Sequence, residues 1–190
     1  MRNVIEKLHG EGHPVRILDI AAGAGRYVTE TLHELPDIST NATLRDYKQE
    51  NVDAARALAQ EFGLENVTVE QGDAFDRDSI AAIAPHATIG IVSGLYELFP
   101  RNEPILNSLR GLAGAIQPGG YLIYTNQPWH PQVEFIARVL RNREGEPWIM
   151  RRRTTAEIDE LVCVAGFRKM AMEVDQWGMF TVSIARRPEP

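Results

Sequence analysis

The sequence predicts an α/β fold: a Rossmann-like, seven-stranded, mostly parallel sheet with helices on both faces and a C-terminal antiparallel hairpin strand. First, strand-like apolar runs alternate with helical patterns, which favours parallel strands joined by right-handed crossovers. Second, a glycine-rich turn at 21–25 directly follows the first apolar run. Third, only a short link near Asp175 and Gln176 separates the last two strand-like runs, so these should pair antiparallel as a hairpin.

The elements of the first half alternate as this fold requires. A strand is expected at 15–20, which is apolar and bounded by polar residues, and a helix at 24–35. A short strand at 42–46 ends in an acid, and the helical pattern at 50–62 places its apolar residues on one face. These residues are Val52, Ala55, Leu58, Ala59 and Phe62, with Gly63 at the expected helix C-cap.

The second half continues the alternation up to the final hairpin. Pro85 ends one predicted helix, and Ala165-Gly166 closes another. The predicted elements are, in order, a strand at 67–69, a helix at 78–84, a strand at 87–93, a helix at 103–116, a turn at 118–120, a strand at 121–125, a helix at 155–164, and strands at about 167–174 and 178–186.

The chain is predicted to form one domain, residues 1–190, because no repeat, low-complexity stretch or linker divides it. Residues 126–153 interrupt the alternation with an irregular stretch that is rich in Pro, Trp and Arg. A long insertion in a compact domain is often a lid or a substrate loop. We therefore expect this insertion to close over a ligand site.

Composition and charge restrict the class of protein. The 190 residues are 44% apolar and 24% charged, which is ordinary for a globular chain, and no apolar stretch approaches the roughly 18 residues of a membrane span. The N-terminus lacks the apolar core of a signal peptide, and the single cysteine, Cys163, allows no disulfide framework. We expect a cytoplasmic protein without a metal site, with Cys163 buried in helix packing. The net charge of −6 argues against broad nucleic-acid binding.

The segment 17–26, Ile-Leu-Asp-Ile-Ala-Ala-Gly-Ala-Gly-Arg, is the most informative part of the chain. It passes from a strand through a small-residue turn into a helix. Glycine allows backbone N–H groups to approach a ligand at such a turn, and the N-terminus of the helix faces the same ligand. The segment therefore predicts a nucleotide-cofactor domain.

Five motifs in order resemble those of class I S-adenosylmethionine-dependent methyltransferases, and together they cover almost the whole chain. They are the segment 17–26, Asp46 at the end of the second strand, Gly72-Asp73-Ala74-Phe75, the turn and strand at 118–123, and Ala165-Gly166-Phe167. The sequence departs from the family pattern at Ala21, where the family has its first glycine. Residues 94–100 and 127–131 further resemble bacterial methyltransferase domains found fused to an α/β-hydrolase, which implies a fused or associated hydrolase domain.

The resemblance implies that S-adenosylmethionine binds at the carboxyl ends of the first three strands. Asp46 would accept from the ribose hydroxyls, unless it is only a solvent-facing loop acid. Asp73 would accept from the adenine amino group, unless it only caps the following helix. Asp19 would hold the loop amides or reach the ammonium group through water, unless it only supports the loop. The full set of cofactor-binding candidates is Asp19, Ala21, Gly23, Gly25, Asp46, Tyr47, Asp73, Ala74, Phe75 and Leu95, with Arg26 and Gln49 as secondary candidates.

In this family the acceptor should lie against the loops after the fourth and fifth strands. Glu97 is a candidate base or ammonium binder, and the alternative is an exposed acid that leads into the next helix. Tyr96 could line the acceptor cavity or pack in the core. His130, next to Trp129, is the preferred base because histidine titrates near neutrality, and the alternative is an ordinary loop residue.

Arginine is concentrated around the insertion. These side chains could hold an anionic acceptor such as a carboxylate or a phosphate. They could equally form a solvated face that balances the acidic remainder of the chain. They are Arg138, Arg141, Arg143, Arg151, Arg152 and Arg153.

The predicted function is methyl transfer from S-adenosylmethionine to a small-molecule or lipid-type acceptor, by O- or N-methylation. One alternative is a non-catalytic domain that binds the same compound to regulate a partner. Another is an NAD-dependent oxidoreductase, which the glycine spacing disfavours because the next glycine after Gly25 is Gly63. The sequence leaves the acceptor and the oligomeric state open.

Overall fold

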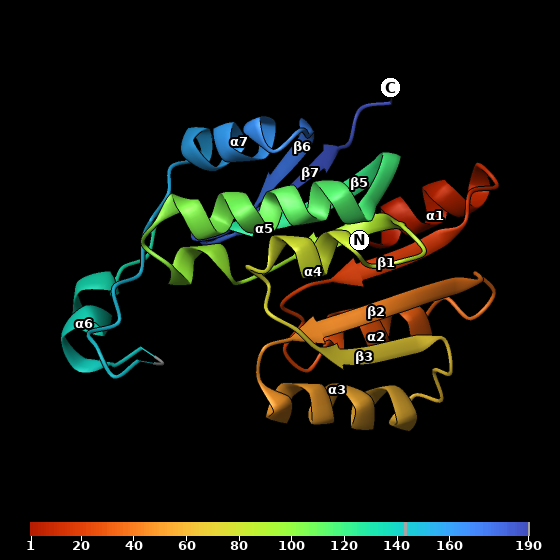
Figure 1. Ribbon diagram of the computed structural model, residues 1–190, viewed down its shortest axis with the longest axis horizontal. Helices are drawn as coiled ribbons and strands as arrows, with labels where there is room; N and C mark the ends of the chain where they lie inside the picture. The colour runs from red at the N-terminus through yellow and green to blue at the C-terminus, as the bar shows by residue number, and fades with distance from the viewer. Residues whose placement is uncertain (143, 190) are drawn as a thin grey trace.

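The computed structural model describes residues 1–142 and 144–189, which form one sheet with helices on both faces (Figure 1). The strands are β1 (Val15–Asp19), β2 (Thr40–Asp46), β3 (Val67–Gln71), β4 (Ala87–Val92), β5 (Ile116–Asn126), β6 (Arg168–Val174) and β7 (Thr181–Arg186). The helices are α1 (Arg2–Gly10), α2 (Arg26–His33), α3 (Gln49–Glu61), α4 (Arg77–Ala81), the 3₁₀ helix η1 (Tyr96–Leu98), α5 (Asn102–Ala115), α6 (Val133–Val139) and α7 (Thr155–Val164).

The seven strands lie in the order β3-β2-β1-β4-β5-β7-β6. The first five are parallel to their neighbours, whereas β7 is antiparallel to both β5 and β6. This arrangement confirms the predicted fold class and its C-terminal hairpin. The chain builds outward from β1 in one direction and then returns to place β4 on the other side of β1. The carboxyl ends of β1 and β4 therefore form a topological switch point, where ligands bind in open α/β sheets.

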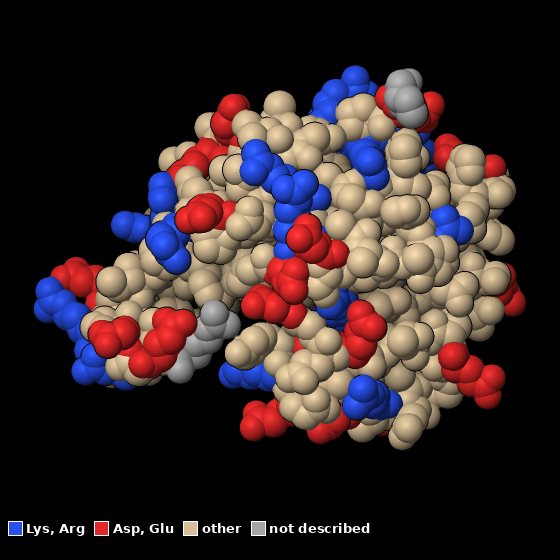
Figure 2. Space-filling model, in the orientation of Figure 1, with Lys and Arg blue, Asp and Glu red and all other residues tan. Residues whose placement is uncertain are grey.

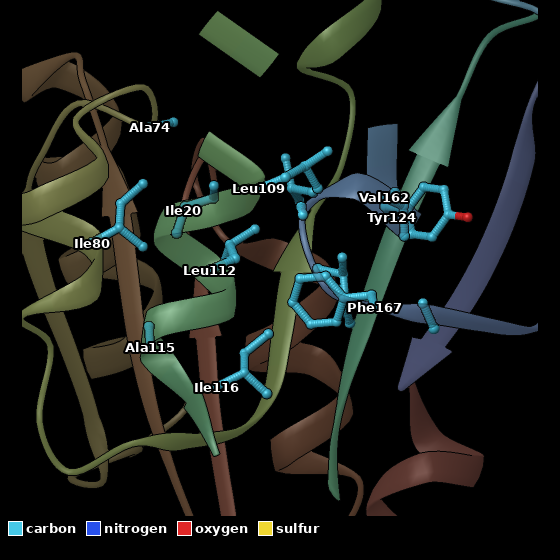
Figure 3. Packing of buried hydrophobic residues seen from close by; sticks show 14 of the residues in the cluster. Ile20, Ala74, Ile80, Leu109, Leu112, Ala115, Ile116, Tyr124, Val162 and Phe167 are labelled. Atoms are coloured by element: carbon cyan, nitrogen blue, oxygen red, sulfur yellow. The ribbon is translucent and has the colours of Figure 1, made fainter. Parts of the chain in front are cut away.

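Each face of the sheet has its own apolar core. On one face, α4, α5 and α7 cover a cluster that includes Leu109 and Leu112 of α5. Figure 3 shows these side chains together with Tyr124 of β5 and with Phe167, which directly precedes β6. On the other face, α1, α2 and α3 cover a second cluster. The central strand β4 is buried along its whole length, which explains its uninterrupted apolar sequence.

Several elements differ from those that the sequence predicts. Two helices, α1 and α6, were not expected, and β5 begins at Ile116, so the predicted turn at 118–120 is an irregular part of that strand. Cys163 is exposed, which overturns its expected burial. The buried face of α7 consists of Ile158 and Val162, and Cys163 lies outside it.

The predicted insertion follows β5 in the chain and contains the short helix α6. Figure 1 shows α6 projecting past the carboxyl ends of the parallel strands, at the left of the molecule. None of the residues of α6 is buried. Over the residues that the structure describes, none of the helices has the length and apolar character that crossing a membrane requires.

Candidate active site

The loop between β1 and α2 forms the centre of the candidate site. Gly23 and Gly25 both adopt left-handed backbone angles, with φ of +56° and +65°. A side chain at Gly25 would come within 2.5 Å of Leu44 Cδ1, whereas one at Gly23 would meet no atom within 4 Å. Gly25 is thus needed for close packing on β2, and Gly23 leaves open space on the side where a ligand can approach. Ala21 is accommodated without positive φ.

Asp46 holds this loop at the end of β2. Its Oδ2 accepts a hydrogen bond from the backbone N–H of Gly23 (2.9 Å). Its Oδ1 accepts from the N–H of Lys48 and from the side chain of Asn51, both at 2.9 Å. Because a carboxylate offers about four lone-pair positions, Asp46 retains capacity for a hydroxyl donor. No local pattern in the sequence identifies Asn51 as a partner of Asp46.

Asp19 is fully buried at the end of β1. Its Oδ2 accepts a short hydrogen bond from the hydroxyl of Tyr27 in the first turn of α2. Its Oδ1 has no hydrogen-bond partner among the described residues. Burial raises the pKa of Asp19 to about 7, against the lowering effects of the Tyr27 hydroxyl and of the nearby Ala21 backbone N–H. Tyr27 was not a sequence candidate, although its spacing of eight residues from Asp19 is compatible with this contact.

The turn after β3 supplies a second set of polar groups. Asp73 Oδ1 accepts from the N–H of Phe75 (2.9 Å), and the helix cap is Asp76, which accepts from Ser79. The capping alternative for Asp73 is therefore wrong. Within the described part of the chain, the N–H of Ala74 makes no hydrogen bond, so it is available as a donor.

Phe75 connects this turn with the loop after β4. Its ring packs edge-to-face on that of Phe99, with ring centroids 4.6 Å apart. Leu95 is half-buried beside the same core. Tyr47 is 55% exposed, and its backbone carbonyl accepts from Gln71. The secondary candidates Arg26 and Gln49 form local contacts within their own helices.

The acceptor-side candidates are distributed differently from expectation. Glu97 is 4% exposed, not an exposed acid, and its Oε2 has no partner among the described residues. Burial raises the pKa of Glu97, partly offset by the nearby charge of Arg153. Tyr96 packs in the core, and its hydroxyl donates to Ser108 Oγ (2.9 Å). The hydroxyl is therefore committed inside the core, which argues against the predicted catalytic role of Tyr96.

His130 lies in the insertion with its Nδ1 accepting from the backbone N–H of Gln132 (3.0 Å). Because Nδ1 accepts this bond, the neutral ring carries its proton on Nε2, and that nitrogen is then a donor. This geometry disfavours His130 as the base. Trp129 beside it is 48% exposed.

Among the described arginines of the insertion, Arg151 and Arg153 bind other parts of the chain. Arg153 is completely buried and donates to the carbonyls of Tyr96 (2.6 Å), Phe99 (2.8 Å) and Arg101 (3.0 Å). Arg151 donates through its backbone N–H to the carbonyl of Glu97 (2.9 Å). These two arginines therefore shape the loop after β4, a role that sequence reasoning missed because nothing local distinguishes them from the other arginines.

Arg138 lies on α6, and Arg141 and Arg152 lie outside the helices of the insertion. Arg138 pairs with Glu134 on α6, and Figure 2 shows side chains of both charges on this projection rather than a basic face. Arg141 and Arg152 are exposed. Arg143 lies outside the described residues.

Known proteins are similar to this chain in sequence and in fold. A family model described as "Putative methyltransferase" matches residues 1–187. The chain belongs to this family. The curated protein "Uncharacterized protein YnbC" of Escherichia coli (strain K12) is 50% identical to this methyltransferase over 189 residues. That match covers 98% of this chain and 32% of the relative, so the chain spans about a third of the relative's length.

Solved structures of methyltransferases have the same fold. An O-methyltransferase family protein from Burkholderia thailandensis superposes with a TM-score of 0.73 at 19% identity, covering 100% of this chain and 55% of that one. The magnesium protoporphyrin IX methyltransferase from Synechocystis PCC 6803, solved with bound SAH, superposes with a TM-score of 0.72 at 16% identity, covering 97% and 80%. At these identities the likeness concerns the fold.

The family match confirms the resemblance to methyltransferases and the predicted enzyme class. The same match argues against the alternative of an NAD-dependent oxidoreductase. The known structures support S-adenosylmethionine as the cofactor of this fold, in agreement with the expectation from the sequence. The acceptor and the individual residue roles are not determined by these comparisons.

Proposed function

We propose that this methyltransferase binds S-adenosylmethionine at the carboxyl ends of β1, β2 and β3 and methylates a small molecule placed against the loops after β4 and β5. The observation that carries this proposal is the unpartnered Oδ1 of Asp19, a fully buried carboxylate oxygen at the tip of β1. A buried carboxylate oxygen that lacks a hydrogen bond is costly, so it favours a ligand that brings a cation or a donor. The amino-acid end of S-adenosylmethionine carries such a group.

The other groups at these strand tips fit the remainder of the cofactor. Asp46 would accept from the ribose hydroxyls, and Asp73 from the adenine amino group. The free N–H of Ala74 would donate to the adenine ring, with Phe75 against its face. The open side of Gly23 would admit the methionine portion. Leu95 and the exposed Tyr47 remain candidates for apolar contacts at the edges.

The chemistry requires little from the protein beyond alignment and exclusion of water. When bound, S-adenosylmethionine supplies a methyl group that its sulfonium has already activated. The chain would orient the acceptor for in-line attack and keep the cleft dry. A neutral hydroxyl or ammonium acceptor must also lose a proton, and a positioned base provides for this.

Glu97 is the base that the geometry favours. Its Oε2 has no hydrogen-bond partner among the described residues, and burial raises its pKa, which makes it a stronger base than an exposed carboxylate. His130 offers a donor nitrogen in its neutral form, because Gln132 occupies Nδ1. O- and N-methylation are both compatible with a carboxylate base.

The acceptor proposed here is a small or lipid-type molecule with an apolar body. Trp129 and Phe135 expose large apolar surfaces on the insertion, 48% and 61% accessible. An anionic acceptor finds less support, because the guanidinium of Arg151 is engaged with the Pro100 carbonyl and with Glu157, and that of Arg153 with backbone carbonyls. A cytoplasmic location, and a hydrolase domain fused to or associated with the chain, are proposals that follow from the sequence alone.

Binding and turnover test the proposal separately. Calorimetric titration should give binding of S-adenosylmethionine and S-adenosylhomocysteine but not of NAD. Transfer of a labelled methyl group should then be assayed over a library of alcohols, phenols, amines and lipids. Absence of binding to either sulfur compound would refute the proposed site.

Variants then test the base with the acceptor found in that screen. Glu97→Gln should lower kcat by about 10²-fold or more, the usual scale for a general base, and leave the affinity for S-adenosylhomocysteine unchanged. Glu103→Gln, an exposed acid at the start of α5, is the matched control. If His130→Ala lost the activity and Glu97→Gln kept it, the base would be His130.

A further inference from the structure

Arg45 is a buried arginine that the cofactor site as described does not use. It lies in β2 directly before Asp46, and only 5% of it is exposed. Its Nη2 donates to Ser79 Oγ (2.7 Å) at α4, and its Nε lies 3.0 Å from Glu70 Oε1. Neither Nε nor Nη1 makes a hydrogen bond among the described residues. A buried cation with incomplete hydrogen bonding contributes little to stability, so its consequence is better sought in geometry.

The guanidinium lies directly against Gly72. A Cβ on this glycine would come within 2.3 Å of Arg45 Nη2, 2.5 Å of Nε and 2.6 Å of Cζ. Gly72 does not have a positive φ, so the backbone conformation itself does not demand glycine. The requirement at this position is therefore steric: the flat face of the guanidinium occupies the space that a side chain would need.

The backbone of the same arginine contacts the other cofactor loop. The carbonyl of Arg45 accepts from the N–H of Ala22 (2.9 Å), and the carbonyl of Asp46 accepts from the N–H of Gly72 (3.0 Å). Arg45 thus joins the β1–α2 loop, through its backbone, to the turn after β3, through its side chain. It also lines a groove of about 670 Å³ beside β2 and β3. The guanidinium consequently separates that groove from Gly72.

We propose that Arg45 is a positioning residue for the cofactor: its guanidinium is the platform on which Gly72 rests, and it sets where Asp73 and Ala74 present their groups to the adenine. This inference rests on the proposed function. Gly72 and Arg45 then act as one pair, because the guanidinium can support the turn after β3 only if no side chain at position 72 lies between them. The effect of the pair is on binding of the adenosyl group, not on proton transfer at Glu97.

A double-mutant cycle tests the pair. Gly72→Ala should weaken binding of both adenosine and S-adenosylhomocysteine by about tenfold or more, because the new Cβ displaces the turn. Arg45→Ala should produce a similar loss. In the double variant the absent guanidinium leaves room for the Cβ, so binding should be no weaker than in Arg45→Ala alone. Equal loss for the two ligands assigns the effect to the adenosyl end.

The controls separate positioning from folding and from the proposed function. Gly10→Ala, where a Cβ meets nothing within 4 Å, and Arg110→Ala on the exposed side of α5 should bind as the wild type does. Thermal unfolding establishes that each variant is folded, and Arg45→Met replaces Arg45→Ala if the alanine variant is not. Unchanged affinity in a folded Arg45 variant, or additive losses in the double variant, would overturn this inference alone. A wild-type chain that binds neither ligand would instead overturn the proposed function, and this inference with it.

Discussion

Four buried charged side chains divide into two kinds by their surroundings. Arg153 donates to several carbonyl oxygens, and Arg45 packs against Gly72, so both organise loops. Asp19 and Glu97 are acids at or just after strand ends, and each keeps one oxygen without a hydrogen bond among the described residues. Because a buried carboxylate oxygen without a hydrogen bond is costly, we expect these two acids to meet ligands at the strand ends. One lies on the cofactor side and one on the acceptor side.

The unusual protonation of Asp19 should be visible in the pH dependence of stability. Burial raises its pKa to about 7, whereas an unfolded aspartate titrates near 3.9. Between about pH 4 and pH 7 the folded chain therefore binds a proton that the unfolded chain has released. This contribution to the free energy of unfolding falls as pH rises through that interval and levels off above it. Urea unfolding of wild type and Asp19→Asn across the interval measures the difference.

The Asp19→Asn variant cannot ionise at this position, so its stability relative to wild type should increase with pH up to about pH 7. Asp53→Asn, on the exposed surface of α3, is the control and should follow the wild type. A constant difference between wild type and Asp19→Asn over the whole interval would show that Asp19 is ionised throughout.

Asp46 should contribute directly to cofactor affinity. Asp46→Ala removes the ribose acceptor and the partner of Gly23 N–H, so binding of S-adenosylhomocysteine should weaken by about 1–3 kcal/mol, the scale for hydrogen bonds to a charged group. Calorimetry measures this loss, with Asp53→Ala as an exposed control. An affinity equal to that of wild type would remove Asp46 from the site.

At the scale of elements, the sequence predicts those parts of the fold that have a strong local pattern. The run into β4 and the apolar face of α3 are both visible in the sequence, and the structure confirms them. α6 is short and has no buried residue, so its pattern is weak. α1 does have an apolar face, formed by Val4, Ile5 and Leu8, which was not recognised as a helical pattern in the sequence. Packing of Tyr96 in the core was one of its two predicted interpretations, whereas the burial of Glu97 could not be predicted, because it depends on Arg153, which is distant in sequence and folds the loop around itself.

The cofactor loop was predictable for a related reason. A strand, a small-residue turn and a helix are consecutive in sequence, so Gly23 and Gly25 could be placed without tertiary information. Their different functions could not, because Leu44 and the open space beside Gly23 belong to the folded chain. The partners of Asp19 and Asp46 are similarly set by α2 and by the start of α3.

The two loop glycines should respond differently to alanine. At Gly23 the left-handed conformation alone costs about 1–2 kcal/mol of folding stability. At Gly25 the same cost applies, and the overlap with Leu44 adds about 1–3 kcal/mol. Gly25→Ala should therefore be the less stable variant in urea unfolding. Gly23→Ala should instead show the larger loss of cofactor affinity per unit of lost stability, since its Cβ enters the ligand side. Equal effects of the two variants on both measurements would contradict this division.

At the scale of the whole molecule, the two proposed ligand regions lie at one edge of the sheet. The tips of β1, β2 and β3 carry the adenosyl candidates, and those of β4 and β5 carry the acceptor candidates. The hydrogen bond from Gly94 N–H to Thr125 Oγ1 (2.8 Å) joins the loop after β4 to the end of β5. The contact between Phe75 and Phe99 joins the two regions. α6, within the insertion, lies past the same edge and contains no buried residue (Figure 1).

The insertion should be dispensable for folding and for cofactor binding. α6 contains no buried residue, whereas Asn126 and Arg153 at the two ends of the insertion are buried and joined by a hydrogen bond of 3.0 Å from the Asn126 side chain to the Arg153 carbonyl. The ends are therefore held close together, and a short Gly-Ser linker can replace residues 129–149. The shortened chain retains Arg151 and Arg153, and with them the loop that carries Glu97.

The shortened chain should unfold at nearly the wild-type temperature and bind S-adenosylhomocysteine with affinity within about twofold of wild type, because it has lost no buried apolar surface from α6. Methyl transfer to the acceptor should be lost, because nothing then covers the apolar body of the acceptor or excludes water from the cleft. Thermal unfolding, calorimetry and the labelled-methyl assay measure these three properties on the same preparation. A shortened chain that still methylates the acceptor at the wild-type rate would show that the insertion is not the lid, and one that loses cofactor binding would show that it belongs to the adenosyl site.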